Sequence, residues 1–256
     1  MVTEALAIIQ ARMSSSRLPG KVLLDICGKP MLERVLERVN FARLVDHTLV
    51  ATSTDPSDDS LAMWCKDYGV DCFRGSMQDV LDRFYQAALL HKPRFVARIT
   101  SDCPVIDPGL IDDTIRTCRE NDVDFAATRL PPPFHRTYPI GLDVEVSTFA
   151  ALERAWREAS NPAEREHVFP YLYDQPGRFN LKILNHEPDY GSLRWTVDTA
   201  KDLELIIRIY EHFLPREEFR WLEVLELVES KPELALINAE IAHKSYLDVD
   251  ERGGKS

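Results

Sequence analysis

The sequence lacks the signatures of several common protein classes. None of its five cysteines forms a C-x-x-C pair or is spaced with histidines as in a zinc site, so we expect neither a redox motif nor a zinc ribbon. The N-terminal apolar run from Ala5 to Ile9 is too short for a signal peptide or a membrane span, which favours a cytoplasmic protein without membrane contact. The net charge of −11 argues against a nucleic-acid partner, because such proteins use broad basic faces.

The glycine motifs of familiar phosphate-binding loops are also missing. The chain has no G-x-G-x-x-G, which excludes the dinucleotide-binding fingerprint. Gly20-Lys21 does not open a P-loop, because Val22 follows it and Ser15 stands where that loop has its first glycine. A phosphate site in this protein therefore has to be built from other groups.

Short apolar runs alternate with amphipathic segments in the first half of the chain. The composition is that of a globular protein, with 45% hydrophobic residues. The patterns predict strands over 5–9, 48–51, 70–73 and 95–99 and helices over 31–39, 56–68, 79–88 and 108–121. This alternation is typical of right-handed βαβ units, so we expect an α/β fold with a mostly parallel sheet and flanking helices.

The pattern becomes irregular after Asp124. Three prolines at 131–133 exclude a helix or a central strand and begin a loop-rich segment to about Gly141. Strands over 144–146 and 179–184, a helix over 148–159 and a helical tail over 199–245 complete the prediction. We interpret 1–256 as a single domain, with an insertion over 128–196 and a helical annex over 199–245.

The loop after the first predicted strand is basic. It runs from Gln10 to Lys21 and carries Arg12, Arg17 and Lys21 with three serines and no acidic residue. In an open parallel sheet, ligands bind beyond the carboxyl ends of the strands. Cations and backbone amides at that position favour a polyphosphate ligand over a merely solvated loop.

Three aspartates follow other predicted strands. Asp107 precedes Pro108 and is best explained as a helix N-cap. Asp102 has no such explanation, and a carboxylate facing a phosphate loop suits Mg²⁺. Asp198 ends an apolar run before the predicted helical tail, and from the residues alone capping by Asp198 or Thr199 and metal binding are equally good interpretations.

Seven motifs follow one another along about four-fifths of the chain. They lie at Ile8–Arg12 with Ser15 and Arg17–Lys21, Ala51–Ser53 with Asp58-Asp59, Arg74–Ser76 with Asp79–Phe84, Arg98–Pro104, Gly141–Val146, Arg165–Val168 and Leu193–Thr199. In this order they resemble the sugar-acid cytidylyltransferases, especially the branch of the spore coat polysaccharide biosynthesis protein F, which is related to the acylneuraminate and 3-deoxy-manno-octulosonate cytidylyltransferases.

The resemblance implies a nucleotide-diphospho-sugar transferase fold, CTP as substrate, Mg²⁺ as cofactor and a homodimer. It implies Arg12, Lys21 and Asp102 as catalytic residues and Asp102 and Asp198 as metal ligands, which favours a functional Asp198. It also implies nucleotide contacts from the loop, from Arg74 and from the strand that precedes Asp102. The full predicted nucleotide site comprises Gln10, Ala11, Arg12, Ser15, Arg17, Gly20, Lys21, Arg74 and Ser101.

An acidic sugar acceptor should contact cations. Arg136, Arg165 and Arg194 are the candidates for its carboxylate, with Asp143, Glu145, His135 and His167 as further acceptor contacts. Alternatives remain at this stage: Arg165 and His167 could pair with Glu164 or Glu166, and Glu145 could face solvent.

The sequence leaves alternative activities open. A nucleotidyltransferase using another nucleotide or a non-sugar-acid acceptor is one, and a glycosyltransferase or a non-catalytic nucleotide-binding protein are less favoured. D-x-D sequences at 122–124 and 248–250 resemble a glycosyltransferase metal motif but lie in turn or tail contexts.

Overall fold

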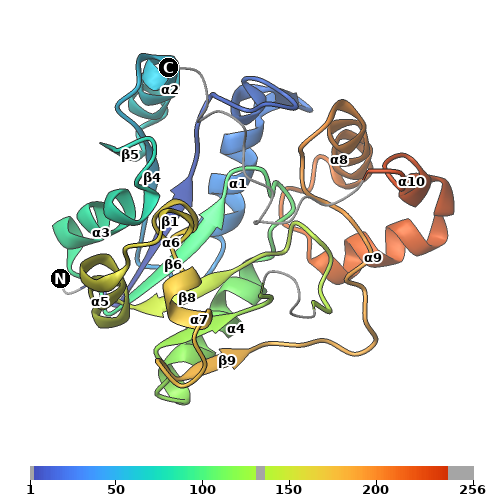
Figure 1. Ribbon diagram of the computed structural model, residues 1–256. Helices are drawn as coiled ribbons and strands as arrows, with labels where there is room; N and C mark the ends of the chain where they lie inside the picture. The colour runs from blue at the N-terminus through green and yellow to red at the C-terminus, as the bar shows by residue number, and fades with distance from the viewer. Residues whose placement is uncertain (1–2, 131–135, 242–256) are drawn as a thin grey trace.

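The computed structural model describes residues 3–130 and 136–241. Its central feature is a seven-stranded sheet with the strand order β5-β4-β1-β6-β8-β7-β9 (Figure 1). The predicted α/β class is therefore confirmed. The strands are β1 Ala5–Gln10, β4 His47–Ser53, β5 Asp71–Gly75, β6 Phe95–Thr100, β7 Phe125–Ala127, β8 Glu145–Thr148 and β9 Leu181–Ile183, beside a small hairpin of β2 Asp25–Ile26 and β3 Lys29–Pro30.

The sheet is parallel in its first four strands and mixed in the rest. β1 lies between β4 and β6 and pairs with both in parallel, and β5 continues the parallel pairing beyond β4. β8 runs antiparallel to β6 and β7, while β7 and β9 are parallel. The carboxyl ends of six strands therefore meet one edge of the sheet, where the amino end of β8 also lies.

Helices cover both faces of the sheet. They are α1 Met31–Asn40, α2 Asp59–Tyr68, α3 Val80–His91, α4 Pro108–Glu120, α5 Phe149–Glu158, α6 Pro162–His167, α7 Pro170–Tyr173, α8 Ala200–Phe213, α9 Trp221–Ser230 and α10 Pro232–Leu236, with 3-10 turns η1 Lys21–Leu23 and η2 Pro56–Asp58. No helix within the described ranges is both long and apolar enough to cross a membrane.

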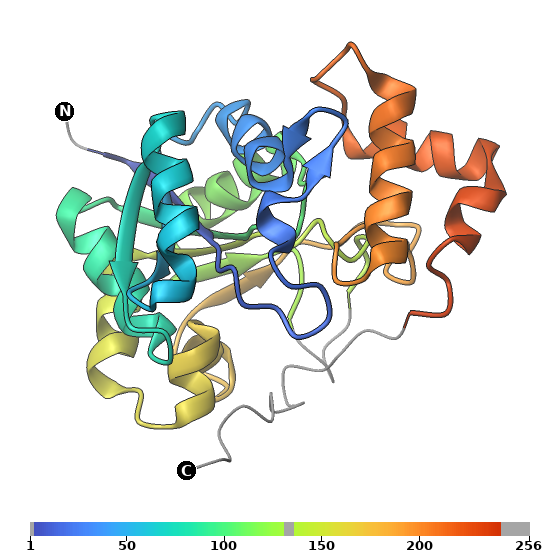
Figure 2. The same cartoon turned by 90° about the horizontal axis from the view of Figure 1, so that it is seen from above.

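Alternate residues of β1 bury into two different cores, as the period of a strand requires. Ala5, Ala7 and Ile9 pack with α1, α4, α8 and α9, whereas Leu6 and Ile8 pack with α3, α5 and α7. The segment from α8 to α10 lies at one side of the molecule in both views (Figures 1 and 2). Its inner residues, such as Leu205 and Val224, join the first core.

Several predicted boundaries need correction. The single helix expected over 56–68 is a 3-10 turn followed by α2, and the strand expected over 70–73 is β5, which ends two residues later at Gly75. The helical tail consists of three helices with an interruption after Leu214, where Pro215 cannot continue the helix. β7 was not expected, because three apolar residues are too few for a periodic pattern. His135 and residues 242–245 lie outside the described residues.

Candidate functional site

The basic loop after β1 folds back against the carboxyl edge of the sheet. Gly20 adopts φ +71°, a conformation that favours glycine, and donates a 2.9 Å hydrogen bond to the Met13 carbonyl. The Met13 amide in turn donates to the Asp58 carboxylate at 2.7 Å, which ties the loop to the end of β4. This closed turn directs Lys21 into the protein at the start of η1.

Lys21 is buried and lies between two carboxylates. Its Nζ is 2.9 Å from Asp102 Oδ2 and 2.9 Å from Asp198 Oδ1, and it donates to the Val197 carbonyl at 2.7 Å. The three side chains come from the loops after β1 and β6 and from the segment before α8. The structure therefore brings together one predicted catalytic cation and both predicted metal ligands.

The segment before α8 docks directly on the loop after β6. The Asp102 carbonyl accepts hydrogen bonds from the Val197 amide at 2.8 Å and from Thr196 Oγ1 at 3.0 Å. Gly141 lies against the other side of this segment with φ +105°, and a Cβ there would lie 2.6 Å from the Trp195 carbonyl carbon. These contacts fix the separation of Asp102 and Asp198.

Asp198 is not the cap of α8. Thr199 and Asp202 form the capping box, and Asp198 instead contacts Arg17 at 2.8 Å and Arg194 at 2.7 Å. Arg194 also contacts Asp202 at 2.9 Å. The capping alternative therefore holds for Thr199, as the sequence allowed, and Asp198 is left to face the basic loop. Asp107, by contrast, caps α4 as expected, accepting from the Gly109 and Leu110 amides.

The charges at this edge shift one another's protonation equilibria. Burial lowers the pKa of Lys21, but the charges of Asp102 and Asp198 outweigh it, so that the net pKa is raised. Burial raises the pKa of Asp102, but Lys21 more than offsets this and the pKa is lowered overall. The pKa of Asp198 is also lowered overall, because Lys21 and Arg17 outweigh burial and the charge of Asp102. At neutral pH all three groups are therefore charged.

The two carboxylates fit a hard divalent cation. Both are deprotonated, and each directs an oxygen to the same point, where the Lys21 ammonium now lies. Mg²⁺ prefers oxygen ligands and is commonly held by one or two carboxylates plus phosphate oxygens. The donor set of Asp102 and Asp198 meets this requirement.

The remaining residues of the predicted nucleotide site line the same edge. Ser15 Oγ accepts from the Leu18 amide at 3.4 Å, and the Ser101 amide donates to the Gln10 carbonyl at 3.0 Å. The Ala11 amide donates to the Ala51 carbonyl at 3.2 Å. The Ser15 hydrogen bond thus closes a turn within the loop, and the other two fix the start of the loop to β4 and to the residue after β6.

Predicted acceptor residues gather at the neighbouring strand ends. Glu145 is buried and pairs with Arg98, whose Nε also donates to Gln10 Oε1 at 3.0 Å. Asp143 lies between Arg129 at 3.4 Å and Arg136 at 3.1 Å. Formally, one carboxylate shared by two guanidinium groups leaves one net positive charge in this trio.

Two predicted binding arginines are engaged elsewhere. Arg165 contacts both carboxylate oxygens of Asp79, with a shortest distance of 2.6 Å, rather than Glu164 or Glu166. Arg74 donates to the Ser53 carbonyl at 2.8 Å and contacts Asp59 at 2.7 Å. Each of these arginines clamps two elements together at the rim of the site.

His167 lies close to the paired charges of the acceptor side. Burial, and next the positive charge of Arg98, lower the pKa of its imidazole despite the nearby carboxylates of Glu166 and Glu145. A neutral ring at physiological pH can donate or accept a hydrogen bond but supplies no charge to an acidic ligand.

Three further arginines have no role predicted from the sequence: Arg83, which is buried, and Arg98 and Arg129, which are partly buried. Arg83 donates to the Ser76 carbonyl at 3.0 Å, and its Nε has no hydrogen-bond partner among the described residues. Burial lowers the pKa of Arg83 to about 10, and the nearby positive charges of Arg12 and Arg98 contribute to this shift. The available signal was a charged residue inside an apolar strand or helix pattern.

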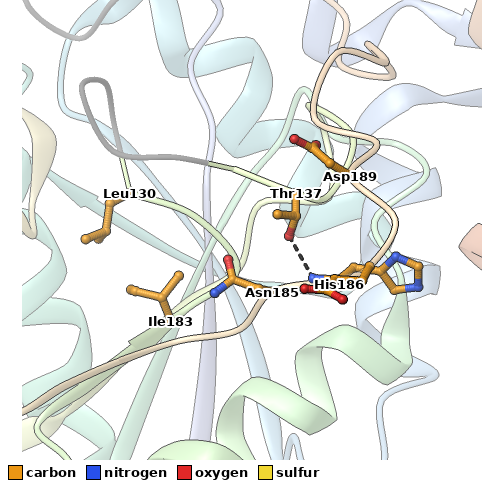
Figure 3. A pocket seen from close by; sticks show the side chains of 7 residues that line it. Leu130, Thr137, Ile183, Asn185, His186 and Asp189 are labelled. Carbon is orange, nitrogen blue, oxygen red and sulfur yellow. Dashed lines mark hydrogen bonds between the residues drawn. The ribbon is translucent and has the colours of Figure 1, made fainter.

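A hollow of about 490 Å³ lies beside β9. Figure 3 shows Leu130 and Ile183 at one end of it and His186 near the other, where the His186 amide donates to Thr137 Oγ1 at 2.7 Å. Glu187 and Asp189 also line it. This acidic lining disfavours an anionic ligand, in contrast to the net positive charge of Arg129, Asp143 and Arg136.

The chain is similar to known cytidylyltransferases in sequence and in fold. A family model described as cytidylyltransferase matches residues 6–230. The chain is 31% identical to the spore coat polysaccharide biosynthesis protein SpsF of Bacillus subtilis, over 91% of this chain and 98% of that protein. It is 40% identical to the 3-deoxy-manno-octulosonate cytidylyltransferase of Anaeromyxobacter sp. (strain K), over 77% of this chain and 93% of that protein. A solved cytidylyltransferase from Leptospira borgpetersenii superposes with a TM-score of 0.86 at 31% identity, covering 94% of this chain and all of that one.

Proposed function

Because the chain belongs to the cytidylyltransferase family, we propose that it transfers a cytidylyl group from CTP to a sugar acid of the nonulosonic or octulosonic type. The products would be a CMP-sugar and pyrophosphate, used in surface glycan synthesis. The observation that carries this proposal is the position of Lys21 between Asp102 and Asp198 at the end of a basic loop.

The proposed reaction is an in-line displacement at phosphorus. A hydroxyl oxygen of the sugar acid bonds to the α-phosphorus, the bond from that phosphorus to the bridging oxygen breaks, and pyrophosphate leaves while the hydroxyl proton passes to solvent. Such transfers need positioning and charge stabilisation more than covalent help from the protein. Arg12, Arg17 and Lys21 supply positive charge where the triphosphate would lie.

We assign Asp102 and Asp198 as the residues that would hold Mg²⁺. Bound there, the ion would neutralise phosphate charge and lower the pKa of the attacking hydroxyl. Lys21 already lies between the two carboxylates and keeps both ionised in the absence of any ion.

We assign the acceptor carboxylate to Arg136. Arg165 pairs with Asp79, and Arg194 pairs with Asp198 and Asp202, so the positive charge of each is already neutralised by carboxylates. Arg136 shares Asp143 with Arg129, and the trio's net positive charge suits an acidic sugar. Glu145 and His167 lie on the same side of the site and would contact the sugar hydroxyls.

The test is pyrophosphate release from CTP and Mg²⁺ with a panel of nonulosonic and octulosonic acids. We expect release with at least one acceptor and loss of at least about 100-fold in turnover for Asp102→Asn, the size expected when a principal electrostatic group is removed. Asp113→Asn is the control, because Asp113 is exposed on α4 and pairs with Arg116 one turn along the same helix. Tight CTP binding without release for any acceptor would contradict the sugar-acid assignment.

A different nucleotide specificity is the second candidate. Thermal-shift measurements with CTP, UTP, GTP and ATP would rank the bases, and we expect CTP to give the largest increase in Tm. We also expect a homodimer, which light scattering would measure.

A further inference from the structure

The opposite edge of the sheet carries a second group of side chains with ligand chemistry. His47 is the first residue of β4, Asp71 is the first residue of β5, and His91 is the last residue of α3. Three elements from separate parts of the chain thus place two imidazoles and a carboxylate at the amino ends of the parallel strands.

These side chains converge on one another. His47 Nε2 lies 2.9 Å from Asp71 Oδ2, and the rings of His47 and His91 are stacked with centroids 4.6 Å apart. One ligand atom from each residue lies within 4.8 Å of the others.

From this convergence we infer a binding site for a first-row transition-metal ion such as Zn²⁺, held by His47, Asp71 and His91. Two nitrogen donors and one carboxylate oxygen match the preferences of zinc, whereas Mg²⁺ prefers an all-oxygen set. Three protein ligands would leave a fourth position for water. A tetrahedral ion with bonds of about 2.0–2.1 Å needs ligand atoms roughly 3.3 Å apart, so the three side chains would have to rotate inward from their present spacing of up to 4.8 Å when the ion binds.

The site is accessible from solvent. The Asp71 side chain is 68% exposed and that of His47 is 35% exposed. A surface hollow of about 370 Å³ adjoins them, lined also by Asn40, Thr48 and Tyr68. An ion can therefore enter with the protein folded.

This site is separate from the proposed nucleotide site. β4 has seven residues, and at about 3.3 Å per residue its two ends lie roughly 20 Å apart. Zinc at its amino end would link the end of α3 to β4 and β5 without touching the substrates. The inference is therefore independent of the proposed function and concerns stability, not transfer chemistry.

Isothermal titration calorimetry of the full chain with Zn²⁺ under reducing conditions tests the inference by measuring the stoichiometry and the Kd of zinc binding. We expect one zinc equivalent whose Kd rises at least about tenfold in His47→Gln, Asp71→Asn and His91→Gln, because even loss of an outer contact to a ligand costs 10–100-fold in metal affinity. His212→Gln is the control and should bind like the wild type, since His212 lies on α8. Absence of binding to the wild type, or unchanged binding in all three variants, would overturn the inference.

Histidine NMR signals distinguish this site from the five cysteines and from the carboxylates around Lys21. The chain has seven histidines, and the signals of His47 and His91 are assigned as those that disappear in the respective variants. These two signals should shift when Zn²⁺ is added and should not shift with Mg²⁺. Zinc should also raise Tm in the wild type and in Asp102→Asn alike. Shifts confined to other histidines, or binding that is lost in Asp102→Asn, would place the ion elsewhere.

Discussion

The two edges of the central sheet hold charged groups in different ways. At the carboxyl edge, Lys21 is buried between Asp102 and Asp198, and each of these three charges has close partners of opposite sign. At the amino edge, Asp71 is largely exposed, and its partner His47 carries charge only when protonated. The comparison shows that one set of strands can present a preassembled ionic site and a loosely held one.

The largest expected effect follows from removing the buried cation. Lys21→Met leaves Asp102 and Asp198 facing each other, so we expect the free energy of unfolding to fall by about 3–5 kcal/mol, as for other broken buried pairs. Urea denaturation measures it. Lys29→Met is the matched control, because Lys29 pairs with Glu37 and Glu217 nearer the surface and should cost about 1 kcal/mol or less. Equal losses in the two variants would remove the distinction between buried and surface pairs.

A smaller effect should separate acceptor binding from nucleotide binding within the carboxyl edge. Arg136→Gln removes charged hydrogen bonds worth about 1.5–3 kcal/mol, so KM for the sugar acid should rise roughly 10–150-fold. KM for CTP should stay within about twofold, because Lys21 and Arg17 are unchanged. Steady-state kinetics measure both, with Arg154→Gln on the exposed face of α5 as control. A rise in the KM for CTP alone would assign Arg136 to the nucleotide.

The free energy of unfolding at acidic pH should depend on the carboxylates beside Lys21. A carboxyl group with a lowered pKa in the folded state adds stability above its unfolded pKa near 3.9, and that stability is lost as pH falls through the folded value. Asp198→Asn should therefore be less stable than wild type at pH 7, with a difference that shrinks below about pH 4. Unfolding curves from pH 7 to pH 2 measure this, and a difference that stays constant with pH would contradict it.

The smallest effect belongs to the amino edge. Without added metal, Asp71→Asn should change the free energy of unfolding by less than about 0.5 kcal/mol, since an exposed pair contributes little. With excess Zn²⁺ the same variant should fall behind the wild type in Tm. Thermal melts with zinc and with EDTA give both values, and a large metal-free loss would mean that the pair itself holds β4 to β5.

Local pattern predicted the regular half of the fold well. β1, α1, β6 and α4 lie within one residue of the predicted bounds because each has an unbroken apolar period. β7 and the β2–β3 hairpin were missed, because elements of two or three residues form through pairing with neighbours and carry no period of their own.

Long-range partners were the least predictable part of the site. Arg165 pairs with Asp79, 86 residues away, although two glutamates adjoin it in the sequence. Nothing local distinguishes these choices, because they depend on where α3 and α6 pack. The metal role of Asp198 stays a prediction that rests on the family resemblance. The residues alone could not distinguish capping of the helix by Thr199 from capping by Asp198.

The close approach of Gly141 to the Trp195 backbone has a consequence for how the sequence can vary. Any side chain at 141 would push the segment that carries Asp198 away from the Asp102 carbonyl, and its φ of +105° already disfavours other residues. In a library of random variants selected for activity, we expect position 141 to admit glycine alone. A residue without a side chain, and so without any group that could take part in the reaction, would then be among the least replaceable in the chain.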